Sequence, residues 1–286
     1  MTITITTSNV NGIRAAKRKG IEQWAAKNTP DVWCMQEVRA PQNEIDPIFD
    51  EFGFEYATAG RIADQSGLDR MNEICRIKGR AGVGLLSALP VIDKRYGLPG
   101  LAEDVDSGRW IEADVKTPQG YTVTVVCVYV HAGNTDDSEK MKQKYRFLDT
   151  MLVRMGQLRD EAAHGGRQAV LCGDFNIAHT PLDIKNAKAN EKHAGFLPEE
   201  RAYVDKWLGE LEFVDVMRSL CGDIQGPYTW WSQRGRAFDN NVGWRIDYQF
   251  ATPELAETAR GFVIDKAPTY DLRWSDHAPL SITYDV

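Results

Sequence analysis

The sequence predicts an α/β protein in which mixed β-sheets are covered by helices on their outer faces. Short apolar runs of strand length alternate along the 286 residues with longer stretches of helical periodicity. Two of the runs, 110–116 and 121–130, are joined by the turn Thr117-Pro118-Gln119-Gly120, which is typical of a β-hairpin. Hairpins combined with crossover helices favour mixed sheets, and in the absence of a repeat or linker we expect one domain over residues 1–286.

The expected strands are apolar runs that end in polar or turn residues. Residues 3–10 begin by alternating isoleucine with threonine, as a half-buried strand does, whereas 32–38 opens with the short apolar run of a buried strand. In chain order, the expected strands are residues 3–10, 32–38, 81–88, 110–116, 121–130, 168–177, 245–251, 261–267 and 280–284.

Three longer segments are expected to form helices. The first, 13–28, stops at Thr29-Pro30, because proline cannot continue a helix. The second, 140–163, is a long amphipathic stretch. The third, 198–208, opens with a proline followed by two glutamates, which are preferred residues in a first helical turn.

Composition places the chain among ordinary globular proteins, with 43% hydrophobic and 26% charged residues. No apolar run approaches the ~20 residues of a membrane span. The first residues alternate like a strand and lack the basic and apolar regions of a signal peptide. The cysteines show no Cys-x-x-Cys spacing, so we expect reduced, buried thiols in a cytoplasmic protein (nucleoid-associated if bacterial), not a disulfide framework or a zinc site. They are Cys34, Cys75, Cys127, Cys172 and Cys221.

The net charge of −7 disfavours a nucleic-acid partner when it is taken alone. Binding depends on local fields, however, and acids that serve a metal site or a solvated face leave room for a basic patch elsewhere. One basic stretch stands out, and it is diluted by Asp69 and Glu73; its members are Arg70, Arg76, Lys78 and Arg80. This stretch is either a solvated loop or part of a contact surface.

Polar side chains that could take part in catalysis or metal binding follow or precede most of the expected strands. Each of them alone has a structural explanation: Asn9 as a turn residue, Glu37 as a partner of Arg39, Asp174 as an acceptor for loop amides. Six such strand ends in one chain favour a site, because sites in α/β folds collect at strand ends. The candidates are Asn9, Asn11, Glu37, Tyr129, Asp174, Asn176, Asp247, Asp276 and His277.

This set of side chains indicates metal-assisted phosphate chemistry. The sequence lacks a Gly-x-Ser-x-Gly nucleophile elbow, a phosphate-binding P-loop and a dinucleotide-binding glycine motif. Carboxylate and amide oxygens without thiolates suit a hard cation, Mg²⁺ or Mn²⁺. Such an ion would polarise a phosphoryl group and steady the leaving oxygen, while His277 with Asp247 would stabilise the charge of the transition state.

Several segments resemble motifs of the exodeoxyribonuclease III / apurinic-apyrimidinic (AP) endonuclease family, within the endonuclease/exonuclease/phosphatase superfamily, and they occur in the order in which that family has them. The glycine- and tryptophan-containing segments 195–201 and 241–248 carry the most specific part of the resemblance, and together the segments span nearly the whole chain. The matching segments are 8–14, Gln36-Glu37, Gly173-Asp174-Phe175-Asn176, 195–201, 241–248 and Ser275-Asp276-His277-Ala278-Pro279.

The resemblance implies a four-layer α/β sandwich, with two mixed β-sheets packed face to face and helices outside. It implies Glu37 as the principal Mg²⁺ ligand, with Asn9, Asn11 and Asp276 completing the metal site or its hydration shell. It also implies that Asp174 orients or deprotonates the attacking water and that Asn176 helps to hold the phosphate. His277, oriented by Asp247, would contact the scissile phosphate, and Tyr129 would hydrogen-bond to it.

The same resemblance implies the groups that recognise the substrate. Trp230, Trp244 and Ile246 would form apolar walls around an abasic sugar, although tryptophans are more commonly core residues. Asn186, Asn190 and His193 would contact the DNA backbone, which positions a duplex without reading its bases. The implied activity is Mg²⁺-dependent cleavage 5′ to abasic sites in double-stranded DNA, with 3′-to-5′ exonuclease action and trimming of 3′ ends. We expect a monomer.

Three departures from the family pattern leave questions open. His131-Ala132-Gly133-Asn134 replaces the proline and amide that many relatives carry, Asn11 stands where some have aspartate, and the segment from Arg61 to Arg80 is longer than in compact relatives. That segment is either an added DNA contact or a surface insertion. The sequence leaves open the number of metal ions, the general base and the ratio of the two activities. Another phosphoesterase of the superfamily, or a non-catalytic binder of damaged DNA, remain as alternatives.

Overall fold

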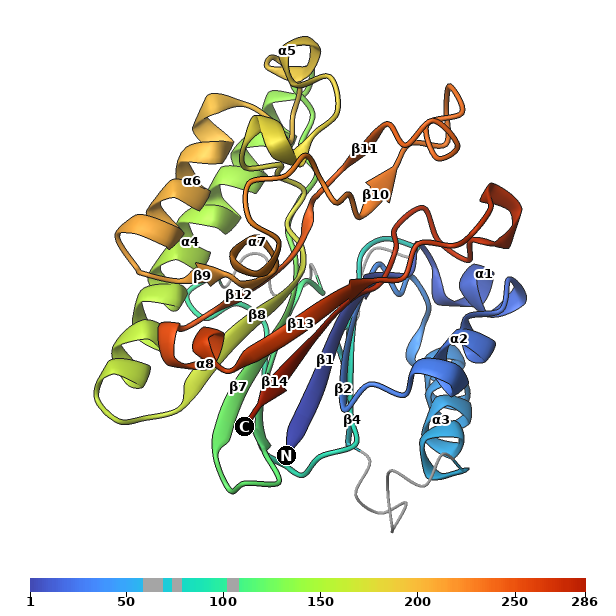
Figure 1. The fold of residues 1–286 in the computed structure, drawn as a ribbon, viewed down its shortest axis with the longest axis vertical. Helices are drawn as coiled ribbons and strands as arrows, with labels where there is room; N and C mark the ends of the chain where they lie inside the picture. The colour runs from blue at the N-terminus through green and yellow to red at the C-terminus, as the bar shows by residue number, and fades with distance from the viewer. Residues whose placement is uncertain (59–68, 74–78, 102–107) are drawn as a thin grey trace.

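Two six-stranded sheets form the centre of the molecule in the computed structural model, which describes residues 1–58, 69–73, 79–101 and 108–286 (Figure 1). Most of the Arg61–Arg80 segment, and Cys75 with it, lies outside the described residues. The four other cysteines are free thiols; Cys34, Cys127 and Cys172 are buried as expected, whereas Cys221 is only partly buried. None of the helices in the described part of the chain is long and apolar enough to span a bilayer.

The first sheet is built around the N-terminal strand. β1 pairs antiparallel with β14 and parallel with β2, so this sheet is mixed. Its remaining neighbours are antiparallel. In spatial order the strands are β13 (Ala259–Ile264), β14 (Leu280–Asp285), β1 (Thr2–Asn9), β2 (Val32–Gln36), β4 (Val83–Ser87) and β3 (Asp69–Glu73).

The second sheet contains the expected hairpin, with Trp110 opposite Val128 in antiparallel register. The parallel pair of this sheet is β7 and β8, and its other pairs are antiparallel. In spatial order the strands are β5 (Val91–Tyr96), β6 (Trp110–Lys116), β7 (Thr122–Tyr129), β8 (Gln168–Asp174), β12 (Asp247–Ala251) and β9 (Val214–Asp215). A separate two-stranded ribbon consists of β10 (Trp230–Trp231) and β11 (Gly243–Trp244).

The apolar core divides into layers that match this arrangement. Ile5 and Leu85 of the first sheet pack with Val125 and Cys127 of the second in a cluster between the sheets. On the outer faces, α4 (Ser138–Ala163) and α6 (Pro198–Gly209) cover the second sheet, while α1 (Ile13–Arg18), α2 (Ile21–Asn28) and α3 (Gln42–Thr58) cover the first (Figure 1). The predicted four-layer α/β sandwich with two mixed sheets is therefore confirmed.

The remaining helical elements are short and lie in the connections. They are η3 (Pro181–Asp183), α5 (Ala187–Asn190), α7 (Val216–Cys221), α8 (Pro253–Glu257) and η4 (Tyr270–Leu272).

Some expected element boundaries were wrong. Residues 13–28 form two helices instead of one, because Gly20 adopts a left-handed backbone with φ of 96°. The strands expected over 32–38 and 168–177 end at Gln36 and Asp174, where Glu37 (φ 55°) and Asn176 (φ 50°) turn the chain. α3 and the mostly exposed strand β5 were not expected, since neither has a strong apolar pattern. Each shortened strand stops beside a site candidate, so these turns position the site.

Candidate active site

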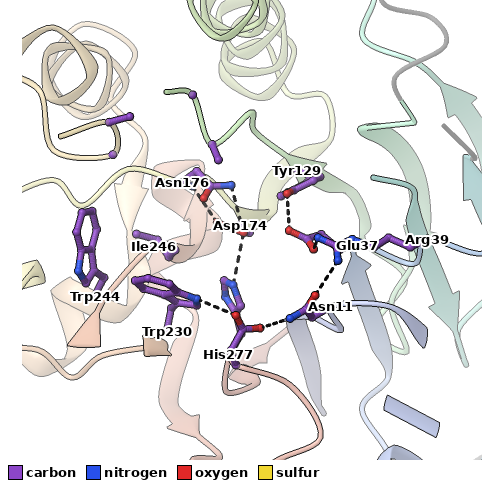
Figure 2. Close-up of a pocket in the computed structure, with 15 residues that line it drawn as sticks. Asn11, Glu37, Arg39, Tyr129, Asp174, Asn176, Trp230, Trp244, Ile246 and His277 are labelled. Carbon is purple, nitrogen blue, oxygen red and sulfur yellow. Dashed lines mark hydrogen bonds and ion pairs between the residues drawn. The ribbon is translucent and has the colours of Figure 1, made fainter. Parts of the chain in front are cut away.

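A cavity of about 380 Å³ opens at the end of the sandwich where the polar strand ends meet (Figure 2). Both sheets and the β10–β11 ribbon contribute to its lining. The lining residues are Asn11, Glu37, Arg39, Tyr129, Ala132, Gly133, Asp174, Asn176, Ala194, Gly195, Trp230, Trp244, Ile246, Asp276 and His277. Ten of the candidates predicted from sequence are in this set, so residues spread between positions 11 and 277 do converge.

Glu37 lies on the first-sheet side of the cavity, immediately after β2. Its backbone has φ of 55°, a conformation that costs free energy in a non-glycine residue and is found preferentially at functional sites. The Tyr129 hydroxyl donates a hydrogen bond to one Glu37 carboxylate oxygen, and the Arg39 guanidinium forms an ion pair with the other. Glu37 is therefore an anchored acid facing the cavity.

Asn11 and Asp276 extend this polar wall. Asn11 Nδ2 donates to Asp276 Oδ1 over 2.7 Å, and Arg39 Nη1 donates to Asn11 Oδ1 over 2.9 Å. Trp230 Nε1 donates to the second Asp276 oxygen over 3.2 Å. Burial raises the pKa of Asp276, but the positive charge of His277 and the two donated hydrogen bonds outweigh it and leave the pKa below its ordinary value. The surroundings of Asp276 thus favour its ionised form.

Asp174 lies at the end of β8 and is nearly inaccessible to solvent, with 1% of its surface exposed. Asn9 Nδ2 donates to its Oδ2 over 2.9 Å, and the Asn176 backbone N–H donates to its Oδ1 over 2.9 Å. The Asn176 side chain is itself held by the Val130 carbonyl at 2.9 Å. Asp174 is consequently fixed from both sheets.

His277 stands between two buried carboxylates. Its Nδ1 lies 2.8 Å from Asp247 Oδ2, and its Nε2 lies 3.8 Å from Asp174 Oδ2. Asp247 and Asp174 face each other in the register of β12 and β8, which brings the two acids together. The second oxygen of Asp247, Oδ1, is buried without a hydrogen-bond partner. One imidazole therefore bridges a pair of acids contributed by adjacent strands.

The electrostatics of this group follow from its burial. Burial raises the pKa of Asp174 to about 7, with the charge of His277 opposing the rise and Asp247 adding to it. Burial lowers the pKa of His277, but the carboxylates of Asp247 and Asp174 outweigh it and raise that pKa to about 10. Near neutral pH the group is an imidazolium beside acids, one of which is poised to exchange a proton. Burial, and then the negative charge of Glu37, raises the pKa of Tyr129, so its hydroxyl stays protonated.

Two parts of the cavity have the chemistry of a cation site. Glu37, Asn11 and Asp276 offer carboxylate and amide oxygens, the donors that hard cations prefer. Asp174, Asp247 and His277 offer ligand atoms within 4.8 Å of one another. Asn9, expected among the metal ligands, does not line the cavity. Both ends of its amide are engaged, since its Oδ1 accepts from the Asn11 N–H at 2.9 Å.

An apolar wall faces these acids. Trp230 and Trp244 are half-buried on the paired strands β10 and β11, and their rings meet edge to face with centroids 5.9 Å apart. They pack with Ile246 on a small cluster that includes Phe196, so they contribute to packing as well as to the lining. The ribbon is joined to the loop that carries His277 by a bridge between Trp230 and His277, and by the Ala278 N–H, which donates to the Thr229 carbonyl at 2.7 Å.

The backbone-contact candidates lie apart from the cavity. Asn186 precedes α5 with φ of 61°, and Asn190 Nδ2 donates to its carbonyl over 3.0 Å. Asn186 and His193 are exposed, and none of the three lines the cavity. In Figure 1, α5 projects at the same end of the molecule as β10 and β11. These residues therefore form an outer surface near the site.

Sequence reasoning missed part of the lining. Arg39 was considered only as a partner of Glu37, yet it reaches Asn11 as well. Gly133 and Gly195 were not singled out, although both have left-handed backbones, with φ of 76° and 93°. The available signal at Gly195 was its place as the first residue of the recognised segment 195–201. Any side chain at this position would crowd Trp244, because its Cβ would lie only 3.0 Å from that ring.

Two mixed sheets between helices, with buried acids and an imidazolium at the strand ends, define a class of α/β hydrolases. The chain belongs to the Endonuclease/Exonuclease/phosphatase family, whose model matches residues 6–277. A relative named exodeoxyribonuclease, from Bacillus subtilis, is 29% identical over 97% of this chain and 98% of its own length. The family predicted from the sequence is confirmed.

Solved structures agree with this assignment. An AP endonuclease from Archaeoglobus fulgidus is similar with a TM-score of 0.80 and 30% identity, over 99% of this chain and all of that one. A 3′ phosphatase from Neisseria, bound to a product DNA hairpin, is similar with a TM-score of 0.79 and 26% identity, over 99% and 100% of the two chains. This chain is accordingly a hydrolytic nuclease of DNA repair, with DNA as its substrate.

Proposed function

We propose that the chain cleaves the phosphodiester 5′ to abasic sites in duplex DNA and trims 3′ ends, with Mg²⁺ or Mn²⁺ as its cofactor. The observation that carries the proposal is the single cavity in which Asp174, His277 and Glu37 face the apolar pair Trp230 and Trp244. The acids and the imidazolium would serve the hydrolysis of a phosphodiester. The apolar wall would contact a sugar that lacks its base.

Glu37, Asn11 and Asp276 would hold the metal ion, because they supply oxygen donors on one side of the cavity. The ion, when bound, supplies Lewis-acid polarisation of the phosphoryl group and charge stabilisation at the leaving oxygen. Asn9 would act through Asp174, to which its amide donates.

The remaining polar residues would handle water, protons and the phosphate. Asp174 would orient the attacking water and accept its proton, as a carboxylate with a pKa raised to about 7 by burial can do near neutral pH. His277, held in orientation by Asp247, would donate a hydrogen bond to a non-bridging phosphate oxygen. The Tyr129 hydroxyl and the Asn176 amide would add hydrogen bonds to the phosphate from the second sheet.

Recognition would depend on shape more than on base identity. Trp230, Trp244 and Ile246 would enclose an extruded deoxyribose, and extrusion costs least where no base is stacked or paired. Asn186, Asn190 and His193 would contact phosphates of the DNA backbone from the surface around α5. Both sheets and both ends of the sequence contribute to one cavity, which supports a single catalytic domain over residues 1–286. We propose that this domain acts as a monomer.

The test uses purified protein, Mg²⁺ and a duplex with one abasic site. Incision 5′ to the lesion, dependent on Mg²⁺ and lost in Asp174→Ala, is the expected result. No incision by the wild type, or full incision by Asp174→Ala, would overturn the proposal. A panel of RNA, inositol phosphates and lipids tests the rival phosphoesterase function, and tight abasic-DNA binding without turnover would indicate a non-catalytic binder. Affinity should fall steeply with salt, because phosphate contacts release counterions.

A further inference from the structure

A buried ion pair lies behind the cavity wall, outside the set of residues that touch its interior. Lys144 of α4 and Glu200 of α6 both have side chains with 0% of their surface exposed, and Lys144 Nζ lies 2.6 Å from Glu200 Oε1. Removing two charges from water is costly, so such a pair needs good geometry and further hydrogen bonds. Its additional partners are almost all backbone groups of the cavity loops.

The Lys144 end holds the loops that follow β7 and β8. Its ammonium donates to the Asn176 carbonyl over 2.9 Å and to the Ala132 carbonyl over 3.2 Å. Both residues line the cavity, and Asn176 carries the backbone N–H that donates to Asp174. The lysine therefore fixes the backbone that orients the proposed base.

The Glu200 end holds the loop before α6. Its Oε2 accepts from the Gly195 N–H at 2.6 Å and from the Leu197 N–H at 3.0 Å. Gly195 lies against the Trp244 ring and the Asn176 carbonyl, where an added Cβ would come within 3.0 Å and 3.2 Å of them. The glutamate thus holds the loop that supports the apolar wall.

The loop that contains Gly133 packs closely against side chains of α4. At Gly133 an added Cβ would come within 2.7 Å of Met141 Sδ and within 3.2 Å of Lys144 Cδ. The Gly133 loop therefore packs directly against α4, the helix that carries Lys144.

We propose that Lys144 and Glu200 are positioning residues, whose buried ion pair clamps three loops and so aligns Asn176 beside Asp174 on one side of the cavity and Gly195 against Trp244 on the other. This proposal deepens the proposed function, on which its turnover readout rests. Its structural readout, the protection of the Gly195 and Leu197 amides, is independent of any activity.

The chain offers a matched control on the same helix. Arg154 of α4 is also buried and forms two hydrogen bonds of 2.8 Å to Glu112 of β6. Within the described residues, the partners of this pair lie outside the cavity lining. Arg154 also bonds Gln157 and Glu161 of α4, and Glu112 also accepts hydrogen bonds from Arg95 of β5 and Trp110 of β6. It stabilises the same layer of the molecule without touching the site loops.

The experiment compares Lys144→Met, Glu200→Gln, the double variant Lys144→Met/Glu200→Met and the control Arg154→Met. Buried pairs replaced by apolar residues commonly keep or gain stability. We expect the double variant to fold, to exchange the Gly195 and Leu197 amide hydrogens at least ten-fold faster than the wild type, and to lose about ten-fold or more in kcat on abasic duplex with a smaller change in KM.

Glu200→Gln keeps the shape and one acceptor oxygen, so it covers the case in which the methionine variants fail to fold. It should show intermediate exchange and turnover. Arg154→Met should retain the wild-type kcat and the wild-type exchange at Gly195. Wild-type exchange and kcat in the double variant, or in Glu200→Gln, would overturn the proposal. If the wild type made no incision, the proposed function would be refuted instead. The amide-exchange rates would still test whether the ion pair holds the loops.

Discussion

The two ends of the sandwich differ in size and in chemistry. The candidate active site has a volume of about 380 Å³, while a larger hollow of about 690 Å³ at the other end is lined by residues such as Tyr121, Val123 and Leu255. Within the described residues, the acids and histidine close enough to share an ion lie at the smaller cavity. The convergence of buried acids, and not the volume of a cavity, therefore identifies the candidate site. Substitutions at the two ends of the sandwich should differ in their effects accordingly.

The largest effect is expected at Asp174. Replacing it with asparagine removes the proposed proton acceptor while keeping its shape, so kcat on abasic duplex should fall about 10³-fold or more. Stability should not fall, because the ionised carboxylate is destabilised by its burial. Single-turnover incision and thermal unfolding measure the two quantities. A kcat within ten-fold of the wild type would exclude Asp174 from proton transfer.

The next effect is on stability alone, in the body of the sandwich. Arg154→Met leaves Glu112 with a buried carboxylate that has lost two of its hydrogen bonds. Breaking a buried pair in this way costs about 3 kcal/mol, while Arg95, which also contacts Glu112, reduces the loss. Urea unfolding measures the free energy, and an unchanged midpoint would show that the pair contributes nothing.

A metal-binding effect should follow at Glu37. Glu37→Gln keeps the shape but removes the charge, so Mn²⁺ affinity in the absence of DNA should fall at least about ten-fold, as measured by calorimetry. Asp247→Asn is the control on the other candidate cation group. If Asp247→Asn weakens binding and Glu37→Gln does not, the ion belongs between Asp174 and His277.

A smaller effect concerns pH. The folded-state pKa of Asp174 is about 7, above the unfolded value of ~3.9, so its ionisation disfavours the folded state. In metal-free buffer, Asp174→Asn should therefore gain stability relative to the wild type as pH rises from ~4 to ~7, with no further gain above that range. A stability difference that is constant with pH would mean that burial does not raise this pKa.

The smallest effect is expected in the larger hollow. Tyr121 is exposed over 61% of its surface, so Tyr121→Ser should change the free energy of unfolding by less than about 0.5 kcal/mol. Incision and Mn²⁺ affinity should match the wild type. A ten-fold loss of incision would show that the far end takes part in function.

Much of the site was predictable because it lies where strands end. Asp174 and Glu37 each stand at the end of an apolar run, and this pattern can be recognised without the structure. The resemblance then supplied the apolar wall of Trp230 and Trp244, which the ribbon does place in the cavity. In these cases the residues that a local pattern or a family motif identifies are the residues that the fold brings to the cavity.

The parts that escaped prediction depend on long-range pairing. Lys144 reads as one more lysine on an amphipathic helix, and only the packing of α4 on α6 reveals that it is buried against Glu200. The break at Gly20 and the exposed strand β5 were missed because tertiary context, not apolar pattern, decides them.

The pairing of β1 with β14 has a consequence during protein synthesis. Thr2 pairs with Asp285 and Thr7 with Leu280, so the centre of the first sheet joins the first and last strands of this sequence. Asn11 and Asp276, which share a hydrogen bond in the cavity wall, are 265 positions apart along the sequence. The cavity is therefore incomplete on a nascent chain until Asp276, His277 and the strand β14 that pairs with β1 have been translated.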